Sequence, residues 1–158
     1  MNADIQMVPM QEKHIPALAQ LERLCFSQPW TESGLRSELH NKLAVFCVAE
    51  QNGQVLGYAG MQCVMGECYI NNIAVFPQFR GMGIGTRLVQ MLMEQAIQRD
   101  GVFISLEVRD TNQQAIYIYR KLGSHEVSCR QNFYTEPVHA GLIITQEFKT
   151  QYGRAGKN

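Results

Sequence analysis

The sequence has no excess of charge of either sign, because its 158 residues carry 14 Lys and Arg against 14 Asp and Glu. Proteins that bind nucleic acid or anionic membranes broadly carry a basic excess, so we expect neither partner here. No apolar run approaches the roughly 20 residues that span a bilayer. The N-terminal residues Met-Asn-Ala-Asp-Ile-Gln lack the basic and apolar regions of a signal peptide, so we expect a cytoplasmic protein.

The five cysteines form no Cys-x-x-Cys pair; they are Cys25, Cys47, Cys63, Cys68 and Cys129. Because several of them lie in apolar or strand-like segments, we expect reduced, buried thiols and no metal site. With 46% hydrophobic and 18% charged residues, the composition is that of a globular protein. The length suits one domain, which we place at residues 1–150, followed by a polar tail at 151–158.

Hydrophobic periodicity predicts a set of strands followed by alternating strands and helices. We expect strands at 4–8, 43–50, 55–65, 68–75, 102–108, 124–132 and 142–148, and helices at 13–25, from Thr31, from about 84 to a stop at Asp100-Gly101, and at 112–122. Tight turns are expected at Asn52-Gly53 and at Gly66-Glu67. The pattern predicts an α/β (α+β) fold: a mixed sheet with helices on both faces and a right-handed parallel crossover between residues 68 and 108.

The segment from Asn72 to Leu88 is the most informative one, because an apolar strand runs there into a glycine-rich turn that opens an amphipathic helix. At such a junction several backbone N–H groups have no partner within the helix, and the helix dipole adds partial positive charge. Glycines remove the Cβ atoms that would keep a phosphate away from these donors. We therefore predict a phosphate or pyrophosphate site, to which Arg80 and Arg87 add mobile charge.

Two familiar phosphate motifs are disfavoured by the spacing. A Walker A loop needs Gly-Lys-Ser/Thr, whereas Gly85 is followed here by Thr86-Arg87. The dinucleotide fingerprint needs G-x-G-x-x-G, and the spacing here is G-x-G-x-G. A glycine turn that merely fits a tight strand-to-helix corner remains the alternative.

A second polar segment follows about one crossover later. Glu107 lies in an otherwise apolar strand, sharing a face with Ser105. A carboxylate among apolar walls suits a general base that works near neutrality, although Glu107 taken by itself favours a structural acid paired with Arg109 or facing solvent. Likewise, Asn112 is well placed to cap the next helix, and such a tyrosine is more often a core aromatic than an acid catalyst, so Tyr119 gains its significance from its neighbours. Adjacent parallel strands end side by side, where ligands bind in open sheets, so the two segments together favour a site.

Together these segments resemble the GCN5-related N-acetyltransferase (GNAT) superfamily, whose acetyl-CoA signature Arg/Gln-x-x-Gly-x-Gly/Ala reads here as Arg80-Gly81-Met82-Gly83-Ile84-Gly85. Within the superfamily the chain is most similar to the RimI-type ribosomal protein alanine N-acetyltransferases, through residues 25–32, 106–109, 112, 115–116, 119–123 and 130–134. The resemblance implies a mostly antiparallel mixed sheet of six to seven strands, acetyl-CoA as cosubstrate, and no metal.

The resemblance also implies roles for individual residues. Glu107 is expected to accept a proton as general base, and Tyr119 to donate one as general acid. The expected cofactor-binding residues are Ile73, Ala74, Val75, Arg80, Gly81, Met82, Gly83, Ile84, Gly85, Thr86 and Asn112. Trp30 and Tyr134 are expected in the substrate groove, although Trp30 is equally a packing residue under the second helix.

The implied reaction is acetyl transfer to the α-amine of a protein N-terminus, that of a ribosomal protein with N-terminal alanine. Two departures bear on the acceptor: Ser124 stands where the family has Phe, and residues 137–141 offer no acid before the last strand. A lysine side chain or a small-molecule amine is therefore an alternative acceptor. A non-catalytic acyl-CoA sensor is the alternative from another functional class.

Overall fold

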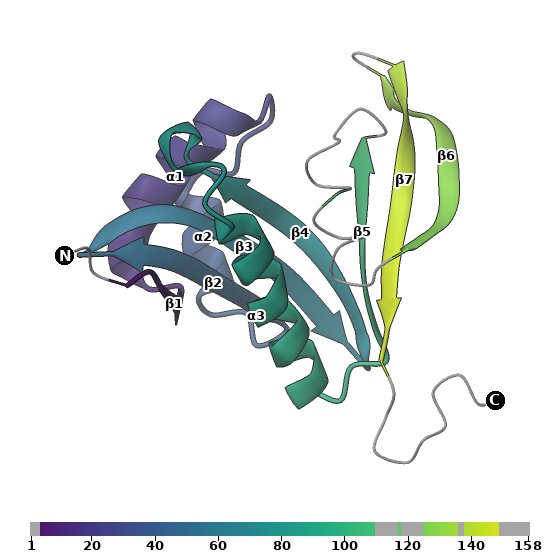
Figure 1. Ribbon diagram of the computed structural model, residues 1–158, viewed down its shortest axis with the longest axis horizontal. Coiled ribbons are helices and arrows are strands. Elements are labelled where there is room, and N and C mark those ends of the chain that lie inside the picture. The colour runs from purple at the N-terminus through teal and green to yellow at the C-terminus, as the bar shows by residue number, and fades with distance from the viewer. Residues whose placement is uncertain (1–3, 110–116, 118–124, 136–137, 149–158) are drawn as a thin grey trace. The chain divides into compact units, whose positions relative to one another are not determined.

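A computed structural model describes residues 4–109, 117, 125–135 and 138–148 (Figure 1). For residues 107–109, 125–135, 138–144 and 146, it describes the backbone alone. The helices are η1 (Glu12–His14), α1 (Ile15–Cys25), α2 (Glu32–Glu38), η2 (Pro77–Phe79) and α3 (Ile84–Gln98). The strands are β1 (Gln6–Pro9), β2 (Ala44–Gln51), β3 (Gln54–Val64), β4 (Glu67–Val75), β5 (Phe103–Arg109), β6 (His125–Thr135) and β7 (Val138–Glu147).

The described strands form a mixed sheet in the order β1-β2-β3-β4-β5-β7-β6. β1–β2, β2–β3, β5–β7 and β6–β7 are antiparallel, whereas β4 and β5 pair in parallel from Glu67–Phe103 to Tyr69–Ser105. The predicted mixed α/β class and its parallel step after β4 are thus confirmed. The chain forms two compact units: Met1–Gln62 with Asn71–Gln95, and Cys63–Ile70 with Ala96–Asn158.

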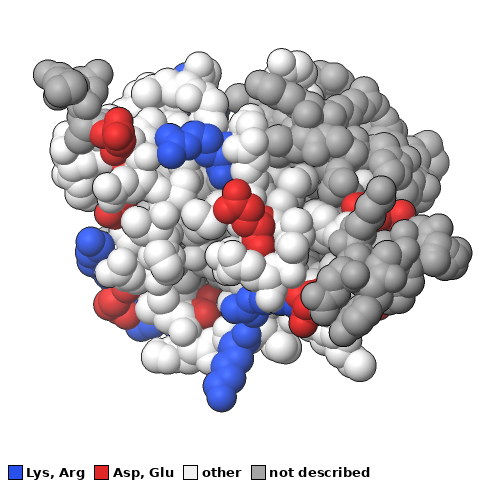
Figure 2. Space-filling view, turned by 60° about the horizontal axis from the view of Figure 1, so that its bottom comes forward, with Lys and Arg blue, Asp and Glu red and all other residues white. Residues whose placement is uncertain are grey.

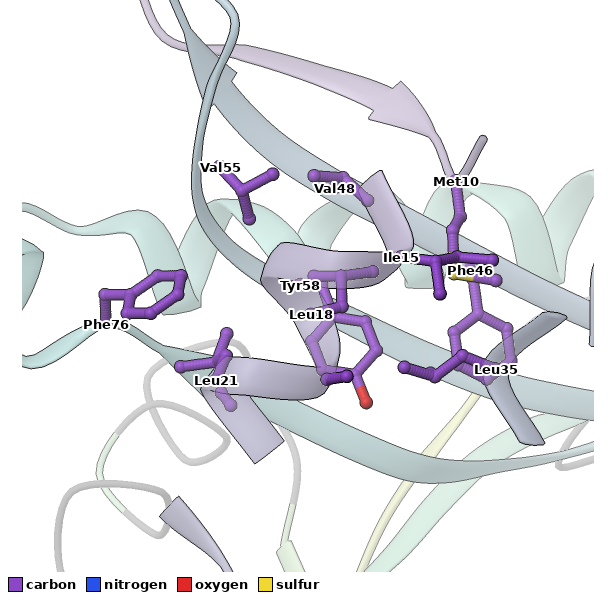
Figure 3. Close-up of a cluster of buried hydrophobic side chains, with 12 residues drawn as sticks. Met10, Ile15, Leu18, Leu21, Leu35, Phe46, Val48, Val55, Tyr58 and Phe76 are labelled. Atoms are coloured by element: carbon purple, nitrogen blue, oxygen red, sulfur yellow. The ribbon is translucent and has the colours of Figure 1, made fainter. Parts of the chain in front are cut away.

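Within the first unit, helices cover both faces of the strands (Figure 1). Alternate residues of β2 point to opposite sides, as strand geometry requires. Phe46 and Val48 face α1 and α2, and belong to a buried cluster with Leu18 and Tyr58 (Figure 3). The thiol of Cys47 faces the other way and lies 4.0 Å from the carbonyl oxygen of Leu88 in α3. The core of this unit therefore has one layer on each side of the sheet.

The predicted helix starts and stops are visible in the backbone. Thr31 caps α2, because its Oγ1 accepts a hydrogen bond from the N–H of Gly34 at 3.0 Å. The predicted apolar stripe of α3 is buried, as the exposed fractions of Ile84, Leu88, Leu92 and Ala96 are 2% or less. After α3, Asp100 takes a φ of 61°, and a Cβ on Gly101 would lie 2.7 Å from the carbonyl oxygen of Ala96. The predicted end of the helix at Asp100-Gly101 is confirmed, but Asp100 and not Gly101 takes the left-handed backbone conformation.

One of the two predicted turns is correct and the other is shifted. Asn52 and Gly53 have φ values of 53° and 79°, which are those of a tight hairpin turn. The second turn lies at Met65-Gly66, with φ values of 51° and 86°, so the prediction of Gly66-Glu67 was wrong by one residue. The reason is that this turn needs positive φ at two successive positions, and glycine fills the second, as in Asn-Gly.

The C-terminal strands are longer than periodicity predicted. β6 begins at His125 and reaches Thr135, and β7 begins at Val138, four residues before the predicted strand at 142–148. The predicted helix at 112–122 lies outside the described residues except for Tyr117, which is helical. Cys47, Cys63 and Cys68 are buried as predicted, and Cys25 is half-buried.

Candidate functional site

The end of β4 lies close to β3. The side chain of Ala74 belongs to the buried cluster, and Ile73 and Val75 are half-buried. A Cβ on Gly57 of β3 would lie 2.7 Å from the carbonyl oxygen of Ala74, so this approach of two backbones requires glycine. The N–H of Phe76 then donates to the carbonyl of Leu56 at 2.9 Å. The backbone of residues 73–75 is therefore held in place before the chain leaves the sheet.

Two glycines of the predicted phosphate turn take left-handed backbone conformations. Gly81 and Gly83 have φ values of 83° and 78°. A Cβ built on either glycine meets no heavy atom within 4 Å. Backbone conformation and not packing thus requires glycine at these positions. The space beside the turn is open, as a ligand that approaches the backbone needs.

The backbone N–H groups of the turn also suit a bound ligand. The N–H groups of Phe79 and Arg80 donate to the carbonyls of Phe76 and Pro77. Along the described chain, the next N–H that donates to a backbone carbonyl is that of Arg87, to Gly83 at 3.1 Å. The N–H groups of residues 81–86 lie between them, at the positive end of the α3 dipole. A run of N–H groups without backbone partners at a helix start can bind phosphate oxygens.

The two exposed arginines of the turn make hydrogen bonds to neighbouring segments. Nε of Arg80 donates to the carbonyl oxygen of Val75 at 3.1 Å, and its Nη2 lies 3.4 Å from Sγ of Cys25. Nη2 of Arg87 donates to the carbonyl of Ile5 at 2.9 Å. Both side chains therefore contact nearby backbone while they keep positive charge near the turn. Figure 2 shows acidic and basic side chains interspersed on one face, consistent with the absence of net charge.

A buried polar cluster, which sequence analysis missed, lies beneath β4. Glu22 of α1 is 1% exposed, and its Oε2 accepts a hydrogen bond from the hydroxyl of Tyr58 at 2.6 Å. Nδ2 of Asn72 donates to the Tyr58 oxygen at 3.0 Å and to Glu22 Oε2 at 3.3 Å. Burial, together with the Glu22 carboxylate, raises the pKa of Tyr58, so its hydroxyl stays a donor. The sequence signal that could have revealed this cluster is Glu22, a charged residue on the apolar face of the helix predicted at 13–25.

The remaining predicted site residues are described to different degrees. Trp30 is half-buried and packs on the core cluster, with its ring centroid 6.0 Å from that of Phe46. Glu107 lies in β5 opposite Ile143, and Tyr134 lies in β6 opposite His139. The side chains of Glu107 and Tyr134, and the whole of Asn112 and Tyr119, fall outside the described residues. Met82 precedes α3, Ile84 is the first residue of that helix, and Thr86 lies in its first turn.

The described residues lack two kinds of feature. No group of three or more His, Cys, Asp or Glu side chains is placed there to hold a metal ion. None of the described helices has the length and apolar character of a membrane span.

Comparison with known proteins agrees with the geometry of the turn. The sequence model of the acetyltransferase (GNAT) family matches residues 15–124. A Bacillus subtilis protein provisionally named ribosomal protein bS18-alanine N-acetyltransferase is 34% identical over 136 residues, which are 85% of this chain and 90% of the relative. The Escherichia coli K12 enzyme of the same name is 31% identical over 125 residues, 79% of this chain and 84% of the relative.

A solved structure extends the likeness to three dimensions. The crystal structure of the ribosomal-protein-S18-alanine N-acetyltransferase from Escherichia coli matches with a TM-score of 0.84 and 27% identity, and 98% of each chain is covered. The family match spans well over half of the sequence and includes the whole glycine turn. The chain therefore belongs to the GNAT family of acetyltransferases and is an N-acetyltransferase.

Proposed function

We propose that the chain transfers the acetyl group of acetyl-CoA to the α-amine of an N-terminal alanine on a ribosomal protein of the bS18 type. Its relatives from Bacillus subtilis and Escherichia coli carry that activity in their names and cover most of the chain. We further propose that residues 1–150 act as one catalytic domain. If the acceptor is an amine other than an N-terminal alanine, residues 137–141, which contain no Asp or Glu, are the segment to compare with that of the relatives.

The observation that carries the proposal is the glycine turn at the start of α3. Gly81 and Gly83 leave open space beside a run of backbone N–H groups, which suits the pyrophosphate of acetyl-CoA. Members of the GNAT family use this cosubstrate. In our proposal the backbone of residues 80–86 holds the pyrophosphate, residues 73–75 hydrogen-bond the pantetheine arm, and Asn112 also contacts the cofactor.

The chemical step we propose is direct transfer. Glu107, directly or through water, removes a proton from the acceptor ammonium, and the amine nitrogen attacks the thioester carbonyl. The N–C bond forms, the C–S bond breaks, and Tyr119 protonates the departing thiolate. The nitrogen then gives its second proton, directly or through water, to the tyrosinate, and Glu107 releases its own proton to solvent. An α-amine with a pKa near 7.8 is about 15% neutral at pH 7, against roughly 0.04% for a lysine. A modest base therefore suffices for an N-terminus. Trp30 and Tyr134 are proposed to line the acceptor side.

The proposal is tested by intact-mass analysis of peptides incubated with acetyl-CoA. One peptide has a free N-terminal alanine and a lysine, the second has the same sequence with the α-amine blocked, and a small amine completes the panel. We expect acetylation of the first peptide alone, at its N-terminus. Acetylation of the blocked peptide or the small amine would assign a different acceptor, and acetyl-CoA binding without turnover of any amine would favour a sensor.

The catalytic roles are tested by Glu107→Gln and Tyr119→Phe. We expect kcat to fall by about 10²–10⁴-fold in each variant, because each removes one proton transfer, with the Kd of CoA unchanged. Glu67→Gln and Tyr69→Phe are matched controls, since these side chains bond each other at 3.1 Å on the surface. We expect no effect on turnover in the controls. Wild-type kcat in both Glu107→Gln and Tyr119→Phe would refute the assigned roles.

A further inference from the structure

The last turn of α1 holds β4 at two points. Glu22 and Cys25 are three residues apart and therefore lie on the same side of the helix. The carboxylate of Glu22 accepts a hydrogen bond from Asn72, and Sγ of Cys25 contacts Arg80, which in turn donates to the carbonyl of Val75. These two attachments bracket Ile73 and Ala74. They fix the segment that we propose to bind the pantetheine arm.

The same carboxylate also holds the connection between α1 and α2. Oε1 of Glu22 accepts a hydrogen bond from the backbone N–H of Trp30 at 2.9 Å, while Oε2 serves Tyr58 and Asn72. Trp30 is thereby tied through its backbone to Glu22 and through its ring to the core cluster. One side chain thus connects the segment proposed to line the acceptor side with the strand proposed to bind the cofactor.

The chemistry of the cluster favours a role in geometry over a role in stability. A buried carboxylate loses its hydration, and its hydrogen bonds often do no more than compensate for this loss. Such a network instead defines one arrangement of its members. Oδ1 of Asn72 has no hydrogen-bond partner within the described part of the chain. Glu22 therefore orients this amide, because turning it over would place Oδ1 against the carboxylate.

We propose that Glu22 is a positioning residue for acetyl transfer, which sets the distance between the acceptor amine and the thioester by fixing the Trp30 segment against β4. The inference rests on the proposed function, because it assumes that the acceptor lies by Trp30 and the cofactor by residues 73–75. Glu22 touches neither substrate in this account and acts through Trp30 and Asn72.

The test is Glu22→Gln, which keeps the size of the side chain but puts an N–H donor against one of the donors it now serves. We expect kcat/KM for the N-terminal alanine peptide to fall about 10- to 100-fold, as small misplacements of reacting groups do. The Kd of acetyl-CoA is expected to change much less, because Arg80 and the 2.9 Å hydrogen bond from Phe76 to Leu56 still hold the end of β4. Trp30 is the only tryptophan, so we also expect its emission to shift to the red and its quenching by acrylamide to increase.

The matched control is Glu50→Gln, which removes the negative charge from the acceptor of the 2.7 Å hydrogen bond with buried His14 at the other end of α1. We expect this variant to lose stability without a change in peptide kcat/KM or in the Trp30 signal. If Glu22→Gln does not fold, Tyr58→Phe removes one member of the same network and is evaluated by the same measurements.

Three results would overturn the proposal. The first is a wild-type value of kcat/KM for the peptide in folded Glu22→Gln. The second is a loss of peptide kcat/KM that is equal in Glu22→Gln and Glu50→Gln. If wild-type protein acetylates no peptide, the proposed function has failed, and the Trp30 signal alone decides whether Glu22 positions this segment. Emission and quenching identical to wild type in Glu22→Gln are then the third such result.

Discussion

Replacing Gly83 by alanine separates the conformational role of the glycine turn from its proposed binding role. Gly83 has a φ of 78°, and a Cβ there meets no atom within 4 Å, so the substitution creates no clash. A left-handed conformation costs an L-residue roughly 1–2 kcal/mol, and the stiffer unfolded chain returns about 0.4–1 kcal/mol. The net loss is about 0.5–1 kcal/mol. We expect Tm to fall by about 1–4 °C for a domain of this size.

The effect on CoA binding is expected to be larger. The added methyl group occupies open space at the turn, where in our proposal it keeps a phosphate from the N–H groups of residues 81–86. A hydrogen bond to a charged group contributes about 1.5–3 kcal/mol. Losing one such bond weakens affinity about 10- to 100-fold, since each tenfold change corresponds to about 1.4 kcal/mol. Isothermal titration calorimetry with CoA measures this change directly.

Gly53→Ala is the matched control. Gly53 has a φ of 79°, and a Cβ there also meets nothing within 4 Å, but it lies in the β2–β3 hairpin. We expect the same fall in Tm as in Gly83→Ala, and wild-type affinity for CoA. If Gly83→Ala binds CoA as tightly as Gly53→Ala does, the glycine turn does not hold the cofactor.

Three further predictions concern the frame around the site. Leu18→Ala removes a fully buried side chain of the core cluster, and we expect a loss of about 2–5 kcal/mol in urea unfolding; a loss below 1 kcal/mol would contradict the packing described. Gly57→Ala places a Cβ 2.7 Å from the carbonyl oxygen of Ala74, and we expect it to cost about 1–3 kcal/mol and to weaken CoA binding by displacing β4; unchanged binding in calorimetry would refute that link. Burial raises the pKa of Cys47 from 9.0 to about 12, so above pH 9 the unfolded chain releases a proton that the folded chain retains. Stability should therefore fall by about 1.4 kcal/mol at pH 10 relative to pH 8, and Cys47→Ala should lose this part of the pH dependence in urea titrations; an unaltered pH dependence would contradict the assignment.

The parts of the fold that depend on local chemistry could be predicted from the sequence. The apolar stripe of α3, the Thr31 cap and the Asn52-Gly53 turn each follow from residues a few positions apart. The turn at Met65-Gly66 was misplaced by one residue, because glycine serves at either position of a two-residue turn. The order of β6 and β7 beside β5 could not be predicted either, since alternation alone does not say which strand of a hairpin lies inside.

The candidate site, too, could be predicted only where it depends on residues close together in the sequence. The glycine spacing located the turn, and the open space beside Gly81 and Gly83 agrees with that prediction. The Glu22–Tyr58–Asn72 cluster was missed because its members are 14 to 50 residues apart, and hydrogen bonds between distant segments leave no periodic pattern. The contact of Arg80 with Cys25, which is 55 residues away, was missed for the same reason.

The central claim is that the backbone N–H groups at the start of α3 bind the pyrophosphate of CoA. The amide NMR spectrum of nitrogen-labelled protein tests it most directly, because Gly81, Gly83 and Gly85 report from the turn, whereas Gly53 and Gly66 report from the hairpins. We predict that CoA shifts the amide signals of the first three glycines and leaves those of the hairpin glycines in place. Saturating CoA that leaves the signals of Gly81, Gly83 and Gly85 unmoved would contradict the account.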